Sequence, residues 1–278
     1  MNRAYLLLCS LAIGILFFAA QTSAYNFEEY FPDNQGSYWV WQETGTDSKW
    51  GPWDDELENH INGFEDVAYG STTFPGYKYF ENDAESEYSI NSWSGGTLMC
   101  LKRVDNRWGA DSSYELFGTS GGSTPDSPFT IVPAWFTNPD TVYETAYKTY
   151  SYSTSDDSLI ASGTQNFRIE FLGFEDVDVP AGHFEDCLKL GLAESWNRVN
   201  ANSDVGIGNL TSTIYFAQGI GEVKSIGTMF NFRDGEESTA NFSKQLVRYH
   251  ITPEPISSIL FLAGGGLLAG RKRFFKKA

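Results

Sequence analysis

The sequence predicts an all-β protein, a curved antiparallel sheet or half-barrel with one apolar segment at each end of the chain. Of its 278 residues 27 are Gly and 16% are aromatic, a composition that favours strands and turns. Short aromatic and β-branched runs alternate with Gly, Pro, Asn and Asp, and no long Ala/Leu/Glu/Lys tract suggests a helical bundle. A hydrophobic fraction of 41% is enough for a folded core.

The first element is a predicted signal peptide over residues 1–24. Arg3 precedes an apolar run that extends to Ala20, and small residues end the segment at Ala24. This order predicts export and cleavage after Ala24 by signal peptidase. The alternatives are an uncleaved N-terminal anchor and, less favoured, a lipoprotein attached at Cys9, where Leu8 replaces the small residue that a lipobox needs.

The last element, residues 253–278, is a predicted short transmembrane helix with a basic end. Its fifteen apolar residues, 256–270, would span roughly 22 Å as a helix, against a bilayer core of about 30 Å. The basic residues that follow should remain cytoplasmic, as should Arg3, so the region between the two ends would be translocated. The motif consists of Pro253, Glu254, Pro255, Arg271, Lys272 and Arg273.

This order of Pro-Glu-Pro, short apolar helix and basic terminus resembles the PEP-CTERM sorting signal of Gram-negative bacteria. The resemblance implies an exosortase-type membrane protease as partner, transient inner-membrane anchoring, and a final location at the cell surface or outside the cell. Because that family belongs to organisms that make extracellular polysaccharide and biofilm, polysaccharide is a further candidate partner. The alternative is an ordinary C-terminal anchor.

The exported region, residues 25–252, contains the strands. We expect one short helix at most, over 54–61, and a hairpin whose turn is made by Pro180, Ala181 and Gly182. The predicted strands cover 37–43, 63–69, 77–80, 87–93, 97–104, 114–117, 141–152, 165–179, 183–192, 211–217, 221–229 and 242–251.

A pentapeptide is repeated within this region. Gly-Phe-Glu-Asp-Val occupies 63–67 and again 173–177, and at the same offset Phe74 matches Phe184. The repeat favours two related meanders, 25–118 and 129–252, joined by a flexible linker. A competing register aligns the Cys-Leu-Lys of 100–102 with that of 187–189, and the two registers exclude each other.

Residues 179–190 and 215–224 also resemble a pattern in uncharacterised bacterial exported β-proteins, which are similar to the half-barrels of periplasmic lipoprotein carriers. This resemblance implies packing and turns and supplies no catalytic or binding residue.

Charge and motifs argue against several functions. A net charge of −17 disfavours nucleic acid as a partner. His60, His183 and His250 lack the spacing of a zinc site, and no nucleophile elbow, phosphate loop or cofactor fingerprint occurs. The acidic clusters at 54–58 and 83–87 lack the pattern of a calcium loop and favour a solvated surface. We expect no catalytic residue, metal or cofactor.

Cys100 and Cys187 are the thiols that remain after removal of the signal peptide, and they are a candidate disulfide in an oxidising compartment. Cys187 falls on the predicted polar face of its strand with Lys189, so two separate reduced cysteines are the alternative.

Three functions remain open. The leading hypothesis is a noncatalytic surface or matrix protein, followed by a binder of an apolar ligand or glycan in the curved sheet and then by a glycan-active hydrolase. The concave side of the sheet distinguishes them, because it would be filled by side chains, open and apolar, or open and acidic.

Overall fold

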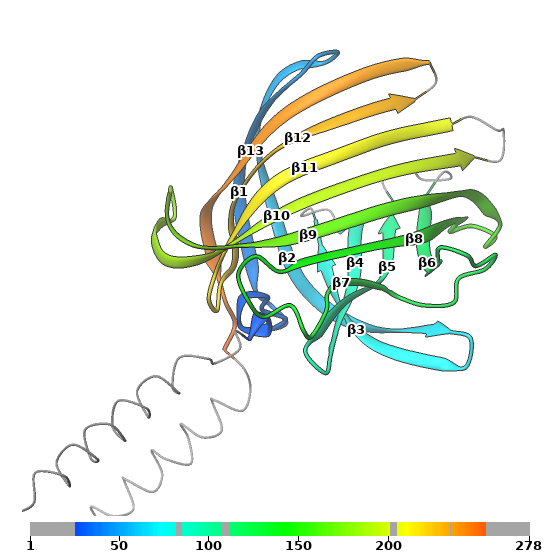
Figure 1. Ribbon diagram of the computed structural model, residues 1–278, viewed down its shortest axis with the longest axis horizontal. Helices are drawn as coiled ribbons and strands as arrows, with labels where there is room; N and C mark the ends of the chain where they lie inside the picture. Colours follow the sequence, from blue (N-terminus) through cyan, green and yellow to red (C-terminus); the bar gives the residue numbers. More distant parts are fainter. Residues whose placement is uncertain (1–25, 82–84, 107–111, 201–204, 234, 254–278) are drawn as a thin grey trace, which may run out of the picture.

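The computed structural model describes residues 26–81, 85–106, 112–200, 205–233 and 235–253 (Figure 1). These residues form one antiparallel sheet of 13 strands preceded by a short 3₁₀ helix, η1, Phe27–Tyr30. The strands are β1 Tyr38–Asp47, β2 Gly51–Tyr69, β3 Thr72–Phe80, β4 Glu87–Ser94, β5 Thr97–Asp105, β6 Ser113–Thr119, β7 Phe129–Val132, β8 Val142–Ser153, β9 Leu159–Val179, β10 Gly182–Asn200, β11 Val205–Ala217, β12 Gly221–Arg233 and β13 Glu236–His250.

The sheet closes into a barrel of twelve strands. Its order is β4-β3-β2-β1-β13-β12-β11-β10-β9-β8-β6-β5, with a further pairing of β4 to β5 that completes the ring and with β7 added to β5. The all-β antiparallel prediction is confirmed, and the half-barrel is wrong, because β1 pairs with β13 and β4 with β5. Closure satisfies backbone groups that an open sheet would expose at its edges.

Each predicted strand range overlaps one strand of the barrel, and only the short β7 was missed. The hairpin at 180–182 is confirmed, because Val179 pairs with Gly182 across the turn. The predicted helix at 54–61 is wrong. Those residues lie in β2, where 54–60 pair with β1 and Ile61 pairs with Tyr79 on β3, and buried Asn59 and Ile61 alternate with less buried neighbours as strand residues do.

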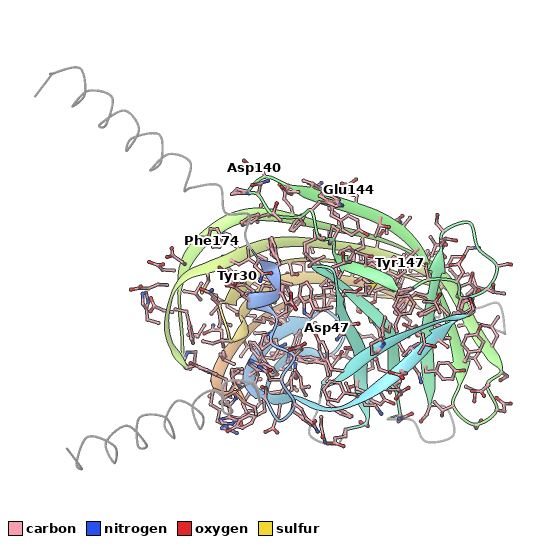
Figure 2. All side chains as sticks on the ribbon, turned by 90° about the horizontal axis from the view of Figure 1, so that it is seen from below. Tyr30, Asp47, Asp140, Glu144, Tyr147 and Phe174 are labelled. Carbon is pink, nitrogen blue, oxygen red and sulfur yellow. The ribbon has the colours of Figure 1, made fainter. Side chains whose placement is uncertain are left out.

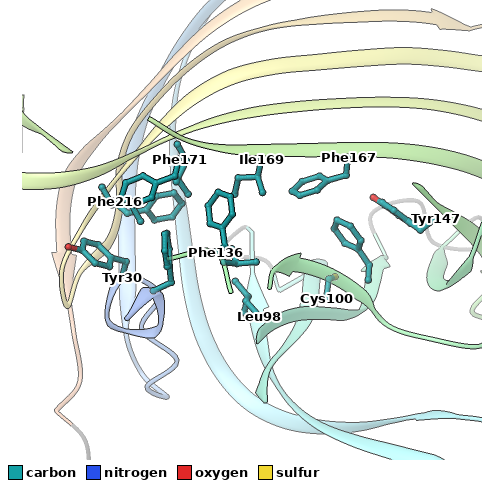
Figure 3. Packing of buried hydrophobic residues seen from close by; sticks show 14 of the residues in the cluster. Tyr30, Leu98, Cys100, Phe136, Tyr147, Phe167, Ile169, Phe171 and Phe216 are labelled. Carbon is teal, nitrogen blue, oxygen red and sulfur yellow. The ribbon is translucent and has the colours of Figure 1, made fainter. Parts of the chain in front are cut away.

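Aromatic side chains fill the barrel interior at one end (Figure 3). Phe167, Ile169 and Phe171 on β9 belong with Leu188 and Leu190 on β10 to one buried cluster, which we call the plugged core. The remaining buried members are Phe27, Tyr30, Leu98, Cys100, Phe117, Phe129, Val132, Phe136, Tyr147 and Phe216. Large rings in edge and tilted contacts give this region its packing energy beyond burial alone.

The N-terminal turn η1 lies inside the ring of strands and closes this end (Figure 2). The ring of Phe27 contacts Phe136 at 5.4 Å and Phe171 at 5.6 Å between centroids. The backbone N–H of Gly219 donates to the carbonyl of Glu29 at 2.7 Å, which fastens η1 to the β11–β12 turn. The turn η1 is therefore a plug of the barrel and part of its core.

Two smaller clusters are buried under the tips of the long hairpins. Val67 and Tyr69 of the β2–β3 hairpin pack with Ile90, Met99 and Leu101 in the first. The second joins the β9–β10 hairpin to β1 and β13. Its buried members are Trp39, Trp41, Ile61, Tyr77, Val177, Cys187, Tyr215, Ala217, Val223 and Leu246.

The first strand begins beside the end of the last strand. Tyr38, at the start of β1, pairs with His250 at the end of β13. The backbone N–H of Thr252 donates to Ser37 Oγ at 3.0 Å. Both ends of the barrel chain therefore leave from the same end of the molecule.

The predicted signal peptide, 1–24, and the apolar helix at 256–270 lie outside the described residues. Within the described ranges, no helix has the length and apolar character needed to cross a bilayer.

Candidate functional site

A charged pocket opens among the strands that close the barrel. It has a volume of about 230 Å³, and strands β4, β5, β6 and β10 contribute to its lining. Arg103, Glu115 and Arg198 are its central residues. The other lining residues are Glu81, Glu87, Tyr88, Val104, Asp105 and Ser113.

The pocket is organised by Glu115. Arg198 Nη1 lies 3.1 Å from Glu115 Oε1, and Ser151 Oγ donates to the same oxygen at 3.1 Å. Arg198 Nη2 donates to Ser151 Oγ at 2.6 Å, so the three side chains form a closed triangle. Ser151 is fully buried, and this geometry holds the Glu115 carboxylate in one orientation.

Arg103 joins the charged pocket to the aromatic interior. Its guanidinium carbon lies 5.7 Å from the centre of the Phe117 ring. Burial on its own would lower the pKa of Arg103, but Cys100, Tyr147, Glu194 and Glu115 together raise it, so the guanidinium stays charged. The positive charge of Arg103 faces the plugged core, and polar and acidic groups on several strands compensate it.

The chemistry of the neighbouring groups does not provide an activated nucleophile. Burial raises the pKa of the Cys100 thiol to about 11, which keeps it protonated at neutral pH. Tyr147 OH donates to Glu194 Oε1 at 3.0 Å, and burial followed by the Glu194 charge raises the pKa of that phenol. These groups are suited to holding a fixed electrostatic environment.

The candidate disulfide residues are both buried free thiols in the structure. Cys100 lies in the plugged core, whereas Cys187 lies in the cluster under the β9–β10 hairpin. The structure therefore contains two separate reduced cysteines, which is the alternative to the disulfide. Cys187 is not on a solvated face as the strand alternation predicted, because the β9–β10 register shifts between Phe184 and Cys187.

Of the predicted sorting motif, Pro253 is described and exposed at the end of the barrel chain. Glu254, Pro255, Arg271, Lys272 and Arg273 lie outside the described residues.

The described members of the acidic clusters form separate surface contacts. Glu56 on β2 pairs with Arg248 at 2.9 Å, and Glu85 contacts His60 at 3.1 Å. Among the described residues, no group of three or more His, Cys, Asp or Glu could hold a metal ion. His183 contacts Asp178 at 2.8 Å on the surface, and this contact raises its pKa.

Sequence reasoning missed the charged pocket. Arg103 and Glu115 lie on consecutive strands, whereas Arg198 is more than 80 residues further along the chain on β10. The sequence signal for Arg103 is its place just after the apolar run 98–101, and that signal does not identify Glu115 or Arg198 as its neighbours.

The architecture defines a closed antiparallel barrel with a plugged interior. No protein-family model matches the chain, and no curated protein matches it. The chain is similar to a solved structure from Bacteroides fragilis described as a candidate exported protein with a YmcC-like fold, with 16% identity, a TM-score of 0.41, and coverage of 80% of this chain and 98% of that one. It is also similar to a candidate lipoprotein from Parabacteroides distasonis, with 14% identity, a TM-score of 0.36 and the same coverage of each chain, 80% and 98%. At these TM-scores neither similarity assigns a function to this chain.

Proposed function

We propose that the protein is a noncatalytic exported cell-surface or extracellular-matrix protein whose barrel is a rigid scaffold. The observation that carries this proposal is the filled interior at the η1 end, where Phe27 and Tyr30 occupy the space between the walls. An apolar-ligand carrier would need that space, and binding there would require displacing both rings and the Gly219–Glu29 hydrogen bond.

A hydrolase is less well supported by the geometry. Glu115 is bound by Arg198 and Ser151, and Glu194 accepts the Tyr147 hydroxyl. A general acid of a glycosidase needs a carboxylic acid with a raised pKa facing the scissile bond. In this structure both carboxylates are instead engaged by side chains of the barrel itself.

Delivery to the surface is proposed to follow the two ends of the chain. Signal peptidase would remove residues 1–24, and an exosortase-type membrane protease would process the tail that begins at Pro253. Intact-mass analysis of protein from the native host tests this step, and we expect a chain lacking both terminal segments. A full-length mass would contradict it.

The scaffold role is tested by a lipid-binding screen on residues 25–252, which contain every described strand. We expect no binding of fatty acids or phospholipids. Tight lipid binding accompanied by release of η1, seen as loss of protection of the Gly219 amide from hydrogen exchange, would favour the carrier instead.

A further inference from the structure

A shallow, open trough crosses the face of β11, β12, β13 and β1 that points away from the plugged core. Its volume is about 580 Å³. Ile214 on β11 packs against the plugged core, so the alternating side chains of Thr211 and Thr213 point to the opposite face. Thr44, Thr46, Thr211, Thr228 and Asn241 are exposed, as expected for the outer surface.

The walls of the trough are two rows of side chains placed by strand register. Pairings between neighbouring strands align one residue from each of the four strands in each row, perpendicular to the strands. One row is Thr213, Ile226, Ser243 and Thr44, and the other is Thr211, Thr228, Asn241 and Thr46. Three interstrand steps of about 4.8 Å make each row roughly 14 Å long.

The floor is the backbone between the rows, and it is fixed from the inner side. A Cβ atom on Gly45 would collide with the Trp53 ring, and one on Gly227 with the Phe242 ring. Both rings therefore lie against the sheet where these glycines leave room. A floor held in this way is formed before any ligand arrives, which lowers the entropy cost of binding.

The lining is uncharged, although the chain carries 36 acidic residues and a net charge of −17. Its hydroxyl and amide groups can both donate and accept hydrogen bonds. Ile226 adds an apolar surface in the middle, where its side chain is 46% exposed. Phe230, two residues beyond Thr228 on the same face of β12, is half-buried and lies outside the lining of the trough.

We propose that this trough binds a neutral glycan chain laid across the four strands. Sugar rings carry hydroxyls at their edges and C–H groups on their faces, which match the hydroxyl and amide groups of the two rows and the exposed Ile226 side chain respectively. An acidic polysaccharide would be repelled by the net charge of the protein. This inference deepens the proposed surface function. It rests on that function only because an exported protein encounters glycans outside the cell.

The test is calorimetric titration of residues 25–252 with cellohexaose, maltohexaose and xylohexaose as neutral probes and hexagalacturonate as the acidic one. We expect at least one neutral probe to bind and the acidic probe not to bind. Thr44→Val with Thr213→Val should weaken binding about 4- to 100-fold, since each lost hydrogen bond costs roughly 2- to 10-fold. Ser243→Trp should fill the trough and abolish binding.

Thr73→Val is the matched control, because Thr73 is an exposed strand threonine on β3, outside the trough. It should bind as the unaltered protein does, and circular dichroism should show the same strand content in all variants. The proposal is overturned if no neutral probe binds at millimolar concentration, if the double valine variant binds unchanged, or if the acidic probe binds best.

A second copy of the chain is the competing occupant. Self-association of the unaltered protein that Ser243→Trp abolishes, measured by sedimentation, would assign the trough to a dimer and overturn the glycan proposal. None of these results depends on processing of the chain ends, so a failure here and a failure of the mass analysis are distinguishable.

Discussion

The β2–β3 and β9–β10 hairpins carry the same pentapeptide and use it in the same way. Gly63 and Gly173 both adopt positive φ, +90° and +105°, where each strand shifts its register. Val67 pairs with Phe74 in the first hairpin, and Val177 pairs with Phe184 in the second. The repeated residues therefore specify a bend followed by a fixed cross-strand pair.

The hairpins differ by one inserted residue. Asp186 has φ +50° and lies in a register shift of β10 that has no counterpart in β3. Beyond it the offset between the hairpins becomes 111 residues, so Lys78 corresponds to Lys189. The ion pair is kept, because Glu65 lies 2.9 Å from Lys78 and Glu175 lies 2.7 Å from Lys189.

The hairpins pack on different partners. The first covers Leu101 on β5, whereas the second reaches β13, where the Ala181 backbone N–H donates to the Leu246 carbonyl at 2.9 Å. The comparison teaches that the pentapeptide determines the shape of a hairpin and that the surrounding strands determine where it docks. It favours the 110-residue register as a hypothesis of duplication over the competing Cys-Leu-Lys alignment.

Truncating the docking partners should have the largest effect. Leu101→Ala and Leu246→Ala each remove a fully buried side chain and should lower the free energy of unfolding by about 2–5 kcal/mol. In double-mutant cycles followed by urea unfolding, Leu101 should couple to Val67 and Leu246 to Val177. Coupling of Leu101 to Val177 would contradict separate docking.

Replacing the glycine of the shared bend by Ala should lower the free energy of unfolding by an intermediate amount, equal in the two hairpins. No atom would meet a Cβ at Gly63 or Gly173, so an Ala at either position suffers only the strain of positive φ, about 1–2 kcal/mol. Gly206→Ala is the control, because that position has equal space without positive φ. Unequal losses at 63 and 173 would show that the bends are not equivalent.

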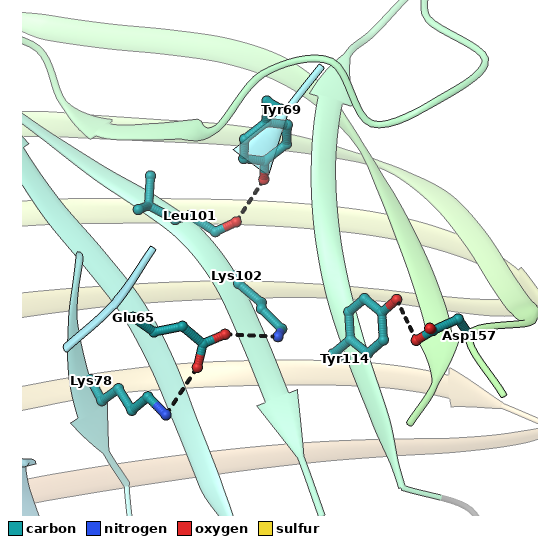
Figure 4. A network of polar contacts seen from close by, with 7 residues as sticks. All are labelled: Glu65, Tyr69, Lys78, Leu101, Lys102, Tyr114 and Asp157. Carbon is teal, nitrogen blue, oxygen red and sulfur yellow. Dashed lines mark hydrogen bonds and ion pairs between the residues drawn. The ribbon is translucent and has the colours of Figure 1, made fainter. Parts of the chain in front are cut away.

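Breaking the ion pairs should lower the free energy of unfolding by less than the preceding substitutions do, and by different amounts in the two hairpins. Glu65 accepts from Lys78 and also from Lys102 at 3.1 Å (Figure 4). Burial alone would raise its pKa, but the two lysines hold it below its ordinary value. Glu65→Gln should cost roughly 0.5–1 kcal/mol at pH 7, and the half-exposed Glu175→Gln less.

The pH dependence of the Glu65 pair has a definite sign. A carboxylate with a lowered pKa in the folded state stabilises the fold above its unfolded pKa of about 4.5, and this contribution is lost as pH falls through the folded pKa. The difference between the unaltered protein and Glu65→Gln should therefore vanish in acid. A difference that persists at pH 2 would show that the amide disturbs packing instead of charge.

The smallest expected effect concerns the thiols. Cys187 occupies the position that Gly76 has in the first hairpin, because each pairs with the pentapeptide Glu. Since both cysteines are free in the structure, a reductant should leave the melting temperature unchanged, and denatured, unreduced mature protein should label at two thiols per chain. Absence of labelling would show that both are oxidised.

The strands were predictable because their period-two pattern and turn residues are local signals. The turn at Pro180 needed only neighbouring residues, and it was found. Closure of the barrel was not predictable, because it depends on pairing Tyr38 with His250 across most of the chain. A short helix is expected over 54–61, but pairing of residues 54–60 with β1 outweighs the local preference.

The candidate sites required the closed fold. Arg103, Glu115 and Arg198 meet only because β5, β6, β8, β9 and β10 are successive neighbours in the ring. The burial of Cys187 depends on the inserted residue at Asp186, since a one-residue slip moves a side chain to the other face. The trough likewise depends on the register of four strands, of which β1 and β13 are distant in sequence.

The adjacency of Tyr38 and His250 has a mechanical consequence. Any tether on the segment before residue 26 and any tether on the segment after residue 253 pull on the barrel from the same pole. Two such attachments at one pole leave the opposite pole free to swing. The strand turns at the opposite pole, including the β1–β2 turn at Trp50, then point away from whatever surface holds the chain.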